Sequence, residues 1–339
     1  MINHRIVIGY ICYLYCISTA AQSPLLTYEA TNDTIIDVPL FLEEKADWQA
    51  MWWNVENLFY PEVDSVNTDH EFTPNGIRHW THSRYQAKVA RIAQVAVNAG
   101  GWQGIDVIGL CEVEDSASVS DIRRLLGKEY KTVHYDSPDP RGIDVALLYR
   151  STCVLLNSYP IPIQLPEGKP TRDLLYARLL MPQHDTIDFL LCHLPSMRGG
   201  YGSAKKNRLV VKTTMQQIID SLLQINNNRQ IVVMGDMNDA PHNDLNGMHN
   251  QMCYLQPKTS HRYPSILGTY KYHGVWSFLD QCYLSKGFIQ RKTEIRVYAP
   301  NYLLEDDERY LGVRPKRTYF GIRYHNGYSD HLPIVLRVK

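Results

Sequence analysis

The fold is decided by the stretch Ile231–Pro241, which reads IVVMGDMNDAP. It opens with four apolar residues, three of them β-branched, and this run predicts a strand buried on both faces. Gly235 ends the run, and two carboxylates and one amide follow within four residues. A rigid strand that ends in Asp and Asn is a good support for an active site, but the same residue types also form plain turns. This stretch alone leaves both interpretations open.

Other apolar runs along the chain also deliver polar side chains at their end or edge. The five further segments are Trp52–Asn57 (WWNVEN), Val107–Glu112 (VIGLCE), Phe189–His193 (FLLCH), Phe278–Leu284 (FLDQCYL) and Tyr328–Pro333 (YSDHLP). Such repetition of Asn, Glu, His and Asp is improbable as turn chemistry alone. It predicts that strand ends from across the chain carry one active site.

These segments, taken together, resemble the endonuclease/exonuclease/phosphatase superfamily, to which deoxyribonuclease I belongs. The resemblance runs in the family's order from about Trp52 to the C-terminus, and it rests on these elements: Asn54, Glu112, His193, Gly235–Asn238, Asp280 and Ser329–His331. The mixture of strands and helices by itself predicts two packed sheets flanked by helices. The resemblance implies more, namely a four-layer α/β/β/α sandwich of the deoxyribonuclease I type, with the site at one end of the paired sheets.

The resemblance also implies a metal-dependent hydrolase of phosphate esters. Glu112 is the leading metal ligand, with Asn54 beside it. Asp330 is either a third ligand or a turn residue that positions His331. Mg²⁺ is the expected cofactor, because it prefers hard oxygen ligands and needs only one or two carboxylates. Mn²⁺ or Ca²⁺ could take its place.

The remaining polar residues of the set receive catalytic roles. Asp236 is expected to activate the attacking water, and Asn238 to hold that water or a phosphate oxygen. His331 is expected to donate to the phosphate, with Asp280 fixing its tautomer and favouring its charged form. His193 would be a second donor on the phosphate side.

Substrate is less well defined by the sequence. Lys+Arg 35 against Asp+Glu 35 gives a formal net charge of zero, which neither supports nor excludes nucleic acid. The segment Arg314–His325 interleaves cations with aromatic rings, so it could hold phosphates and bases or be a solvated loop. Arg172 and the basic stretch Arg198–Arg208 are weaker candidates for phosphate contacts.

We therefore expect a nuclease that hydrolyses phosphodiester bonds, acting as a monomer. The alternative is an inositol-phosphate phosphatase or a sphingomyelinase-type phosphodiesterase, because His193 is similar to those branches as well as to deoxyribonucleases. Abasic-site endonucleases usually carry Asn at that place, which counts against abasic-site repair. A second alternative is a non-catalytic binding protein on the same fold, which should lack one of Glu112, Asp236, Asn238 or His331; all four are present.

The N-terminus predicts export, to the periplasm or the medium. Arg5 precedes the largely apolar stretch Ile6–Ile17, and small residues follow at 18–21, as in a cleaved signal peptide. We expect a signal peptide at 1–21, an arm at 22–47 and the catalytic domain at 48–339, with no transmembrane segment in the mature chain. The cysteines Cys111, Cys192 and Cys282 lie in apolar runs, which indicates buried free thiols.

Apolar spacing predicts three helices. The first begins at Ser83, which could cap it, and ends at Gly100–Gly101; the second spans 116–126; the third spans 203–225. The residues predicted on the buried faces are Tyr85, Val89, Ile92 and Ala96 in the first helix, and Leu209, Met215, Ile218, Ile219 and Leu222 in the third. Strands are predicted at 130–135, 143–149, 174–180, 187–193, 295–298 and 334–338, with antiparallel hairpins in the strand-rich stretch.

Overall fold

The strand β8 (Gln230–Asp236) lies at the centre of the fold and divides its side chains between two cores. The computed structural model describes residues 45–62, 70–196, 201–241, 251–259 and 265–339. Val232 and Met234 belong to the core between the two sheets, whereas Ile231 and Val233 face the core beneath helix α3 (Tyr201–Ile225). All four residues are at most 1% exposed. The prediction of a strand buried on both faces is therefore confirmed.

Each of the two large sheets has six strands. The first sheet has the order β13-β18-β1-β2-β4-β3, and in it only β1 and β2 run parallel. Its strands are β1 (Trp48–Leu58), β2 (Val107–Val113), β3 (Tyr130–His134), β4 (Asp144–Arg150), β13 (Thr293–Val297) and β18 (Ile334–Val338). The second sheet has the order β5-β6-β7-β8-β12-β9, and β7 and β8 are its parallel pair. Its other strands are β5 (Val154–Ile161), β6 (Leu174–Leu180), β7 (Thr186–His193), β9 (Met252–Tyr254) and β12 (Asp280–Ser285).

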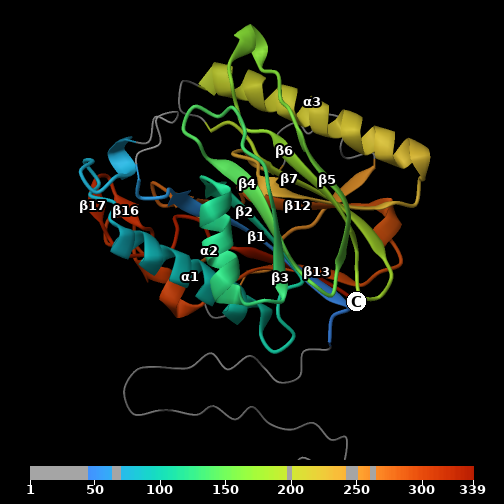
Figure 1. The fold of residues 1–339 in the computed structure, drawn as a ribbon, viewed down its shortest axis with the longest axis horizontal. Coiled ribbons are helices and arrows are strands. Elements are labelled where there is room, and N and C mark those ends of the chain that lie inside the picture. Colours follow the sequence, from blue (N-terminus) through green and yellow to red (C-terminus); the bar gives the residue numbers. More distant parts are fainter. Residues whose placement is uncertain (1–44, 63–69, 197–200, 242–250, 260–264) are drawn as a thin grey trace, which may run out of the picture. The chain divides into compact units, whose positions relative to one another are not determined.

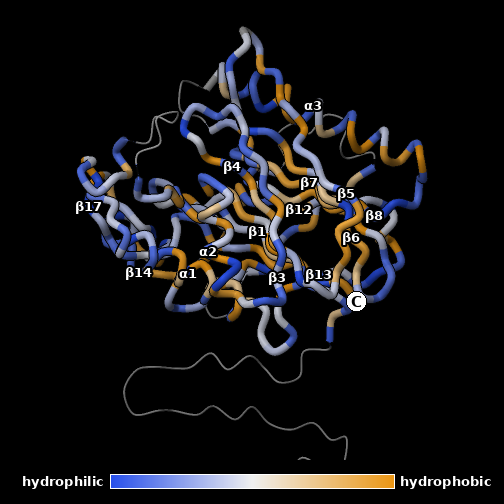
Figure 2. Tube along the Cα trace, in the orientation of Figure 1, coloured by the Kyte–Doolittle hydropathy of each residue, from blue (hydrophilic) through white to orange (hydrophobic). Residues whose placement is uncertain are grey.

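Helices cover the outer faces of both sheets. Figure 1 shows α1 (His82–Gly100) and α2 (Ser116–Leu126) on the side of the first sheet and α3 along the second. In Figure 2 the strands between these helices are largely hydrophobic, and the connecting loops are hydrophilic. The layers therefore run α/β/β/α, as predicted.

The described residues also form short hairpins and single 3₁₀ turns. The hairpins are β10 (Tyr270–Tyr272) with β11 (Val275–Ser277), β14 (Leu304–Asp306) with β15 (Val313–Pro315), and β16 (Tyr319–Phe320) with β17 (Arg323–Tyr324). Single 3₁₀ turns are found at His70–Phe72, Pro166–Gly168, Lys286–Phe288 and Asn301–Leu303.

Two helix predictions were wrong in detail. Thr81, not Ser83, caps α1, because the Thr81 hydroxyl accepts a hydrogen bond from the backbone N–H of Arg84 at 3.4 Å. Leu209 of α3 is 51% exposed. The buried apolar residues of α3 instead recur at steps of three or four from Val211 onward, and Leu209 precedes Val211 by two positions, which places it on the opposite face. The buried residues of α3 include Val211, Met215, Ile219, Leu222 and Leu223.

Several other predictions about helices, strands and cysteines can be compared with the structure. The buried face of α1 and the bounds of α2 are confirmed. The strand-rich stretch does form antiparallel hairpins, but β3 and β4 join the first sheet whereas β5, β6 and β7 join the second. Cys111, Cys192 and Cys282 are buried free thiols. The predicted signal peptide and most of the arm lie outside the described residues. Within the described part of the chain, we find no helix with the length and apolar content needed to span a membrane.

Candidate active site

Strand register brings three of the predicted catalytic residues together. Asp280 is the first residue of β12 and pairs with Asp236, the last residue of antiparallel β8. On the other side of β8, His193 ends the parallel strand β7 and lies beside Asp236. Both neighbours of Asp236 in the sheet are therefore titratable, and Asp236 is 1% exposed.

The first sheet contributes an amide and a carboxylate to the same place. Asn54 on β1 pairs with Cys111 on β2, so the next residue, Glu112, lies close to Asn54. The Asn54 Nδ2 group donates to Glu112 Oε1 at 3.3 Å and to Asp236 Oδ2 at 3.0 Å. One buried amide therefore links acids that come from the two different sheets.

Backbone strain gathers at these strand ends. Glu56, Asn57, Glu112 and Asn238 have φ values of 56°, 53°, 63° and 48°, in the left-handed region that most L-residues avoid. The strained residues near the end of β1 lie where its pairing with β2 shifts register, and there the Asn57 N–H donates to Glu112 Oε2 at 2.9 Å. Such strain costs about 1–3 kcal/mol per residue and persists where the surroundings fix the conformation.

His331 is held by Asp280 in a charge-assisted hydrogen bond. Its Nδ1 lies 2.7 Å from Asp280 Oδ2, and the other oxygen, Asp280 Oδ1, accepts a hydrogen bond from the Trp52 indole at 3.0 Å. Burial alone would lower the pKa of His331, but the negative charges of Asp280 and Asp236 outweigh it and raise this pKa to about 10. The ring is therefore an imidazolium at neutral pH. Its Nε2 lies 3.8 Å from Asp236 Oδ2.

The pKa of Asp236 is also raised, which for a carboxyl group disfavours the charged form. Burial raises the pKa of its carboxyl to about 6, although His331 opposes this shift. The backbone N–H of Asn238 donates to Asp236 Oδ1 at 2.9 Å. The Asn238 side chain donates to the carbonyl of Leu194 at 2.9 Å, so one amide hydrogen fixes the loop and the rest of the amide could contact substrate.

His193 is neutral in this site. Burial, with the nearby cation of Arg172, holds its pKa well below the ordinary value. Its Nε2 lies 3.7 Å from Asp236 Oδ2 and 3.9 Å from Glu112 Oε1. Arg172, a weaker candidate for phosphate contact, is buried and donates to the carbonyls of His193 and Leu194 at 3.0 and 3.3 Å. It therefore fixes the end of β7.

Asp330 has an arginine as its hydrogen-bond partner. Its Oδ2 accepts a hydrogen bond from Arg317 Nη2 at 2.9 Å, so the expected third metal ligand has an arginine as its partner. Arg317 also lies 3.5 Å from Glu56 Oε1, and Arg314 pairs with Glu305 at 2.8 Å. Two of the cations in the basic and aromatic segment 314–325 are thus used inside the fold.

A buried lysine next to the site was not predicted. The Lys88 ammonium on α1 donates to the carbonyl of Glu56 at 2.8 Å and to the Thr318 hydroxyl. Burial lowers its pKa to about 8. The sequence did contain a signal for the burial of Lys88. It lies three residues after Tyr85 and four before Ile92, on the face of α1 that is predicted to be buried. The Trp52 indole that orients Asp280 gave no comparable signal.

The donor set fits a hard divalent cation. Among the described residues, Asp236 and Asp280 lie within 4 Å of His331, and Glu112 and Asp236 lie within 4 Å of His193, so histidines and not lysine or arginine side chains face these acids. A purely geometric grouping of Asp236, Asp280 and His331 could also hold a metal. However, both Asp280 oxygens are hydrogen-bonded and His331 is protonated, so that trio is suited to proton chemistry. Glu112 and Asn54 fit the cation better, since oxygen donors suit Mg²⁺.

The four-layer sandwich, with acids, amides and histidines gathered where its sheets meet, defines the deoxyribonuclease I-like class. The model of the Endonuclease/Exonuclease/phosphatase family matches residues 50–339, and the chain belongs to this family. Members of this family are hydrolases that act on phosphoester bonds. No curated protein matches the sequence.

Solved structures share the fold at low sequence identity. An endonuclease/exonuclease/phosphatase from Bacteroides vulgatus aligns with a TM-score of 0.56 and 14% identity over 86% of this chain and 98% of its own. A mannosyl-6-phosphatase from Bacteroides thetaiotaomicron gives 0.56 and 15% over 86% and 99%. The human Nocturnin catalytic domain gives 0.53 and 15% over 86% and 94%. At this identity the likeness shows the fold alone.

Proposed function

We propose that this protein is an exported, Mg²⁺-dependent phosphoesterase that hydrolyses phosphodiester bonds, with nucleic acid as its substrate. One observation carries the proposal. The Asn54 amide joins the carboxylates of Glu112 and Asp236 at 3.3 and 3.0 Å, and the His331 imidazolium faces Asp236 from 3.8 Å. Oxygen donors, a base and an acid therefore share one buried place.

The metal would be held by Glu112, with Asn54 beside it. When bound, a divalent cation polarises the phosphoryl oxygen and stabilises the leaving oxygen. The Asn57 N–H on Glu112 Oε2 fixes the carboxylate, so that Oε1 remains directed toward Asn54 and His193. Asp330 is not part of this proposal, because its Oδ2 accepts a hydrogen bond from Arg317.

Proton transfer falls to Asp236 and His331. Above pH 6 the carboxylate of Asp236 is ionised and can take a proton from the attacking water. His331 can donate a hydrogen bond or a proton to a phosphate oxygen, and Asp280 keeps Nδ1 protonated so that Nε2 faces the site. His193, held neutral, can donate a hydrogen bond without adding charge.

A phosphatase is the second candidate, because one similar structure is named a mannosyl-6-phosphatase. The same metal, base and acid would serve a phosphomonoester of a sugar or of inositol, or a sphingomyelinase-type reaction. A non-catalytic binding role is less well supported, since every group needed for hydrolysis is present and in contact.

A substrate panel tests the proposal. Purified protein is assayed with single-stranded DNA, duplex DNA, RNA, inositol phosphates, mannose 6-phosphate and sphingomyelin, with Mg²⁺ and with chelator. We expect Mg²⁺-dependent cleavage of a nucleic acid, and loss of at least about 10²-fold in turnover for Asp236→Ala. Sole hydrolysis of a phosphomonoester would favour the second candidate, and no hydrolysis of any ester would contradict both.

Export is proposed from the N-terminal sequence. We expect cleavage after Ala20 or Ala21 when the full chain is produced with its native N-terminus in a bacterium. N-terminal sequencing of the secreted or periplasmic protein measures this directly. Retention of Met1 in the mature protein would contradict it.

A further inference from the structure

A row of aromatic rings leads from His331 to the surface. The Tyr270 ring lies 4.8 Å from the His331 ring, and Tyr272 follows at 6.5 Å from Tyr270 with an interplanar angle of 12°. His273 stacks on Tyr272 at 4.0 Å and 15°, and Tyr310 lies 5.7 Å from His273. Exposure is intermediate at Tyr270 and reaches 61% at Tyr272. We name Tyr270, Tyr272, His273 and Tyr310 the aromatic row.

The base of the row is joined to the catalytic residues. Tyr270 forms a backbone bridge with His331, and the N–H of Leu332 donates to the carbonyl of Thr269 at 2.7 Å. The hydroxyl of Thr269 also accepts a hydrogen bond from the N–H of Asp280 at 3.2 Å. A ligand on the row would therefore have its phosphate within reach of the proposed proton donor.

The outer part of the row is held rigidly. Lys271, between the two tyrosines, donates to the carbonyls of Leu311 and Val313 at 2.8 and 3.1 Å and pairs with Asp307 at 2.9 Å. The hairpin turn packs closely, since a Cβ on Gly274 would lie 3.0 Å from the Cβ of Tyr310. The rings are thus preorganised, which lowers the entropic cost of binding.

The chemistry of the row favours nucleobases over sugars. One face of the Tyr272 ring stacks on His273, and because Tyr272 is 61% exposed, aromatic surface remains on which a base could stack without regard to sequence. The Arg309 guanidinium, 5.2 Å from the Tyr310 ring, adds a cation at the outer end. Lys271 is engaged by Asp307 and two carbonyls, so it is not available to bind the hydroxyl groups of a sugar. In a duplex the base faces are hidden by their neighbours, so the ligand must be single-stranded.

We propose that the aromatic row binds the bases of a single-stranded nucleic acid whose scissile phosphate lies at His331. This deepens the proposed function and rests on it. The row selects substrates that carry planar bases next to the cleaved bond, and it contributes to binding more than to the chemical step.

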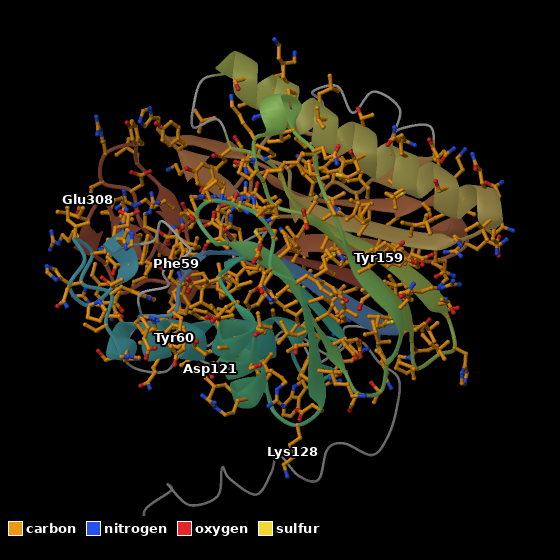
Figure 3. The ribbon with its side chains drawn as sticks, turned by 45° about the horizontal axis from the view of Figure 1, so that its top comes forward. Phe59, Tyr60, Asp121, Lys128, Tyr159 and Glu308 are labelled. Atoms are coloured by element: carbon orange, nitrogen blue, oxygen red, sulfur yellow. The ribbon has the colours of Figure 1, made fainter. Side chains whose placement is uncertain are left out.

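The test compares Tyr272→Ala with the wild type on two substrates of equal length, a short oligothymidylate and an oligomer whose sugars carry no base. We expect KM for the oligothymidylate to rise about tenfold, equivalent to about 1.4 kcal/mol, with KM for the base-free oligomer unchanged. Tyr272→Phe should retain the wild-type KM. Tyr159→Ala on β5 is the control, because Tyr159 is also partly exposed. Figure 3 shows Tyr159 far from Glu308, which precedes Tyr310 by two residues in the sequence.

An equal change on both oligomers, or no change on either, overturns the proposal. It is also overturned if Tyr272→Ala raises KM for mannose 6-phosphate instead. If the wild type cleaves no phosphodiester, the proposed function fails. The binding of a fluorescent oligothymidylate to the wild type and to Tyr272→Ala is then measured by fluorescence anisotropy, with chelator present. A roughly tenfold weaker affinity of Tyr272→Ala then supports the row, and equal affinity refutes it.

Discussion

Replacing Asp280 by asparagine should move the alkaline limit of activity by several pH units. Asp280 is fully buried, and its two oxygens accept hydrogen bonds from the Trp52 indole and from His331 Nδ1. Asparagine is nearly isosteric but neutral, and it offers one acceptor atom where the carboxylate offers two. The substitution therefore removes the charge beside His331 with little change in volume.

The magnitude follows from the pKa of His331, which is about 10 in the wild type. If the pKa returns to its ordinary value of about 6.5, the protonated fraction at pH 8 falls from nearly all to about 3%. Turnover that needs the imidazolium should then fall about 30-fold at pH 8 and only about twofold at pH 6.5. Leaving one buried donor unpaired should also lower the free energy of unfolding by about 1–3 kcal/mol.

The assay is a pH–rate profile of kcat for the wild type and Asp280→Asn, with saturating Mg²⁺ and substrate. The matched control is Asp188→Asn, another buried strand aspartate, which accepts a hydrogen bond from Tyr176 and pairs with Arg229. It lies at the far end of β7 from His193, so it should lose stability without any shift of the profile. An alkaline limb that stays near pH 10 in Asp280→Asn would refute the link between Asp280 and the protonation of His331.

Three further results are expected. Turnover should rise as the pH passes about 6, where Asp236 loses its proton, and fall again near 10, where His331 loses its own; a profile that is flat through pH 6 would exclude Asp236 as the base. Glu112→Gln should raise the Mg²⁺ concentration for half-maximal activity at least about tenfold, because a neutral amide binds the cation more weakly; a titration with an unchanged midpoint would argue against the assigned ligand. Gly235→Ala should lower the free energy of unfolding by about 1–3 kcal/mol in a urea titration, since its Cβ would lie 2.2 Å from Cys192 Sγ; an unchanged midpoint would show that β7 and β8 can separate there.

Strand ends were the part of the site that the sequence revealed best. An apolar run followed by Asn, Glu or Asp is local information, and Asn54, Glu112 and Asp236 could be found from it. The register between strands is not local. That Asp280 lies opposite Asp236, and His193 beside it, depends on how β7, β8 and β12 pair, which periodicity leaves undetermined.

What the sequence did not reveal depended on tertiary neighbours. Asp330 pairs with Arg317, a loop residue that could equally have been solvated. The row that begins at Tyr270 arises because a short hairpin folds back on His331, and a three-residue strand carries almost no periodic signal. Trp52 lies in an apolar run and is buried in the core. Its indole N–H also donates a hydrogen bond to Asp280, as buried Trp side chains usually do to some acceptor.

The strained residues explain why this site is built at the edge of such a rigid sandwich. Asn57, Glu112 and Asn238 adopt left-handed conformations that a glycine would accept with less strain, yet two of them use their side chains in the site. At these positions the fold keeps a functional side chain at the expense of local stability. The buried strands β1, β2 and β8 hold the flanking backbone in place, so the left-handed turns direct Glu112 and Asn238 inward instead of relaxing. Glycine at position 112 should relieve this strain, but it also removes the proposed metal ligand and the acceptor of the Asn54 and Asn57 donors. Loss of Mg²⁺-dependent activity with an unfolding free energy changed by no more than about 1–3 kcal/mol would separate the role of the ligand from that of the strain.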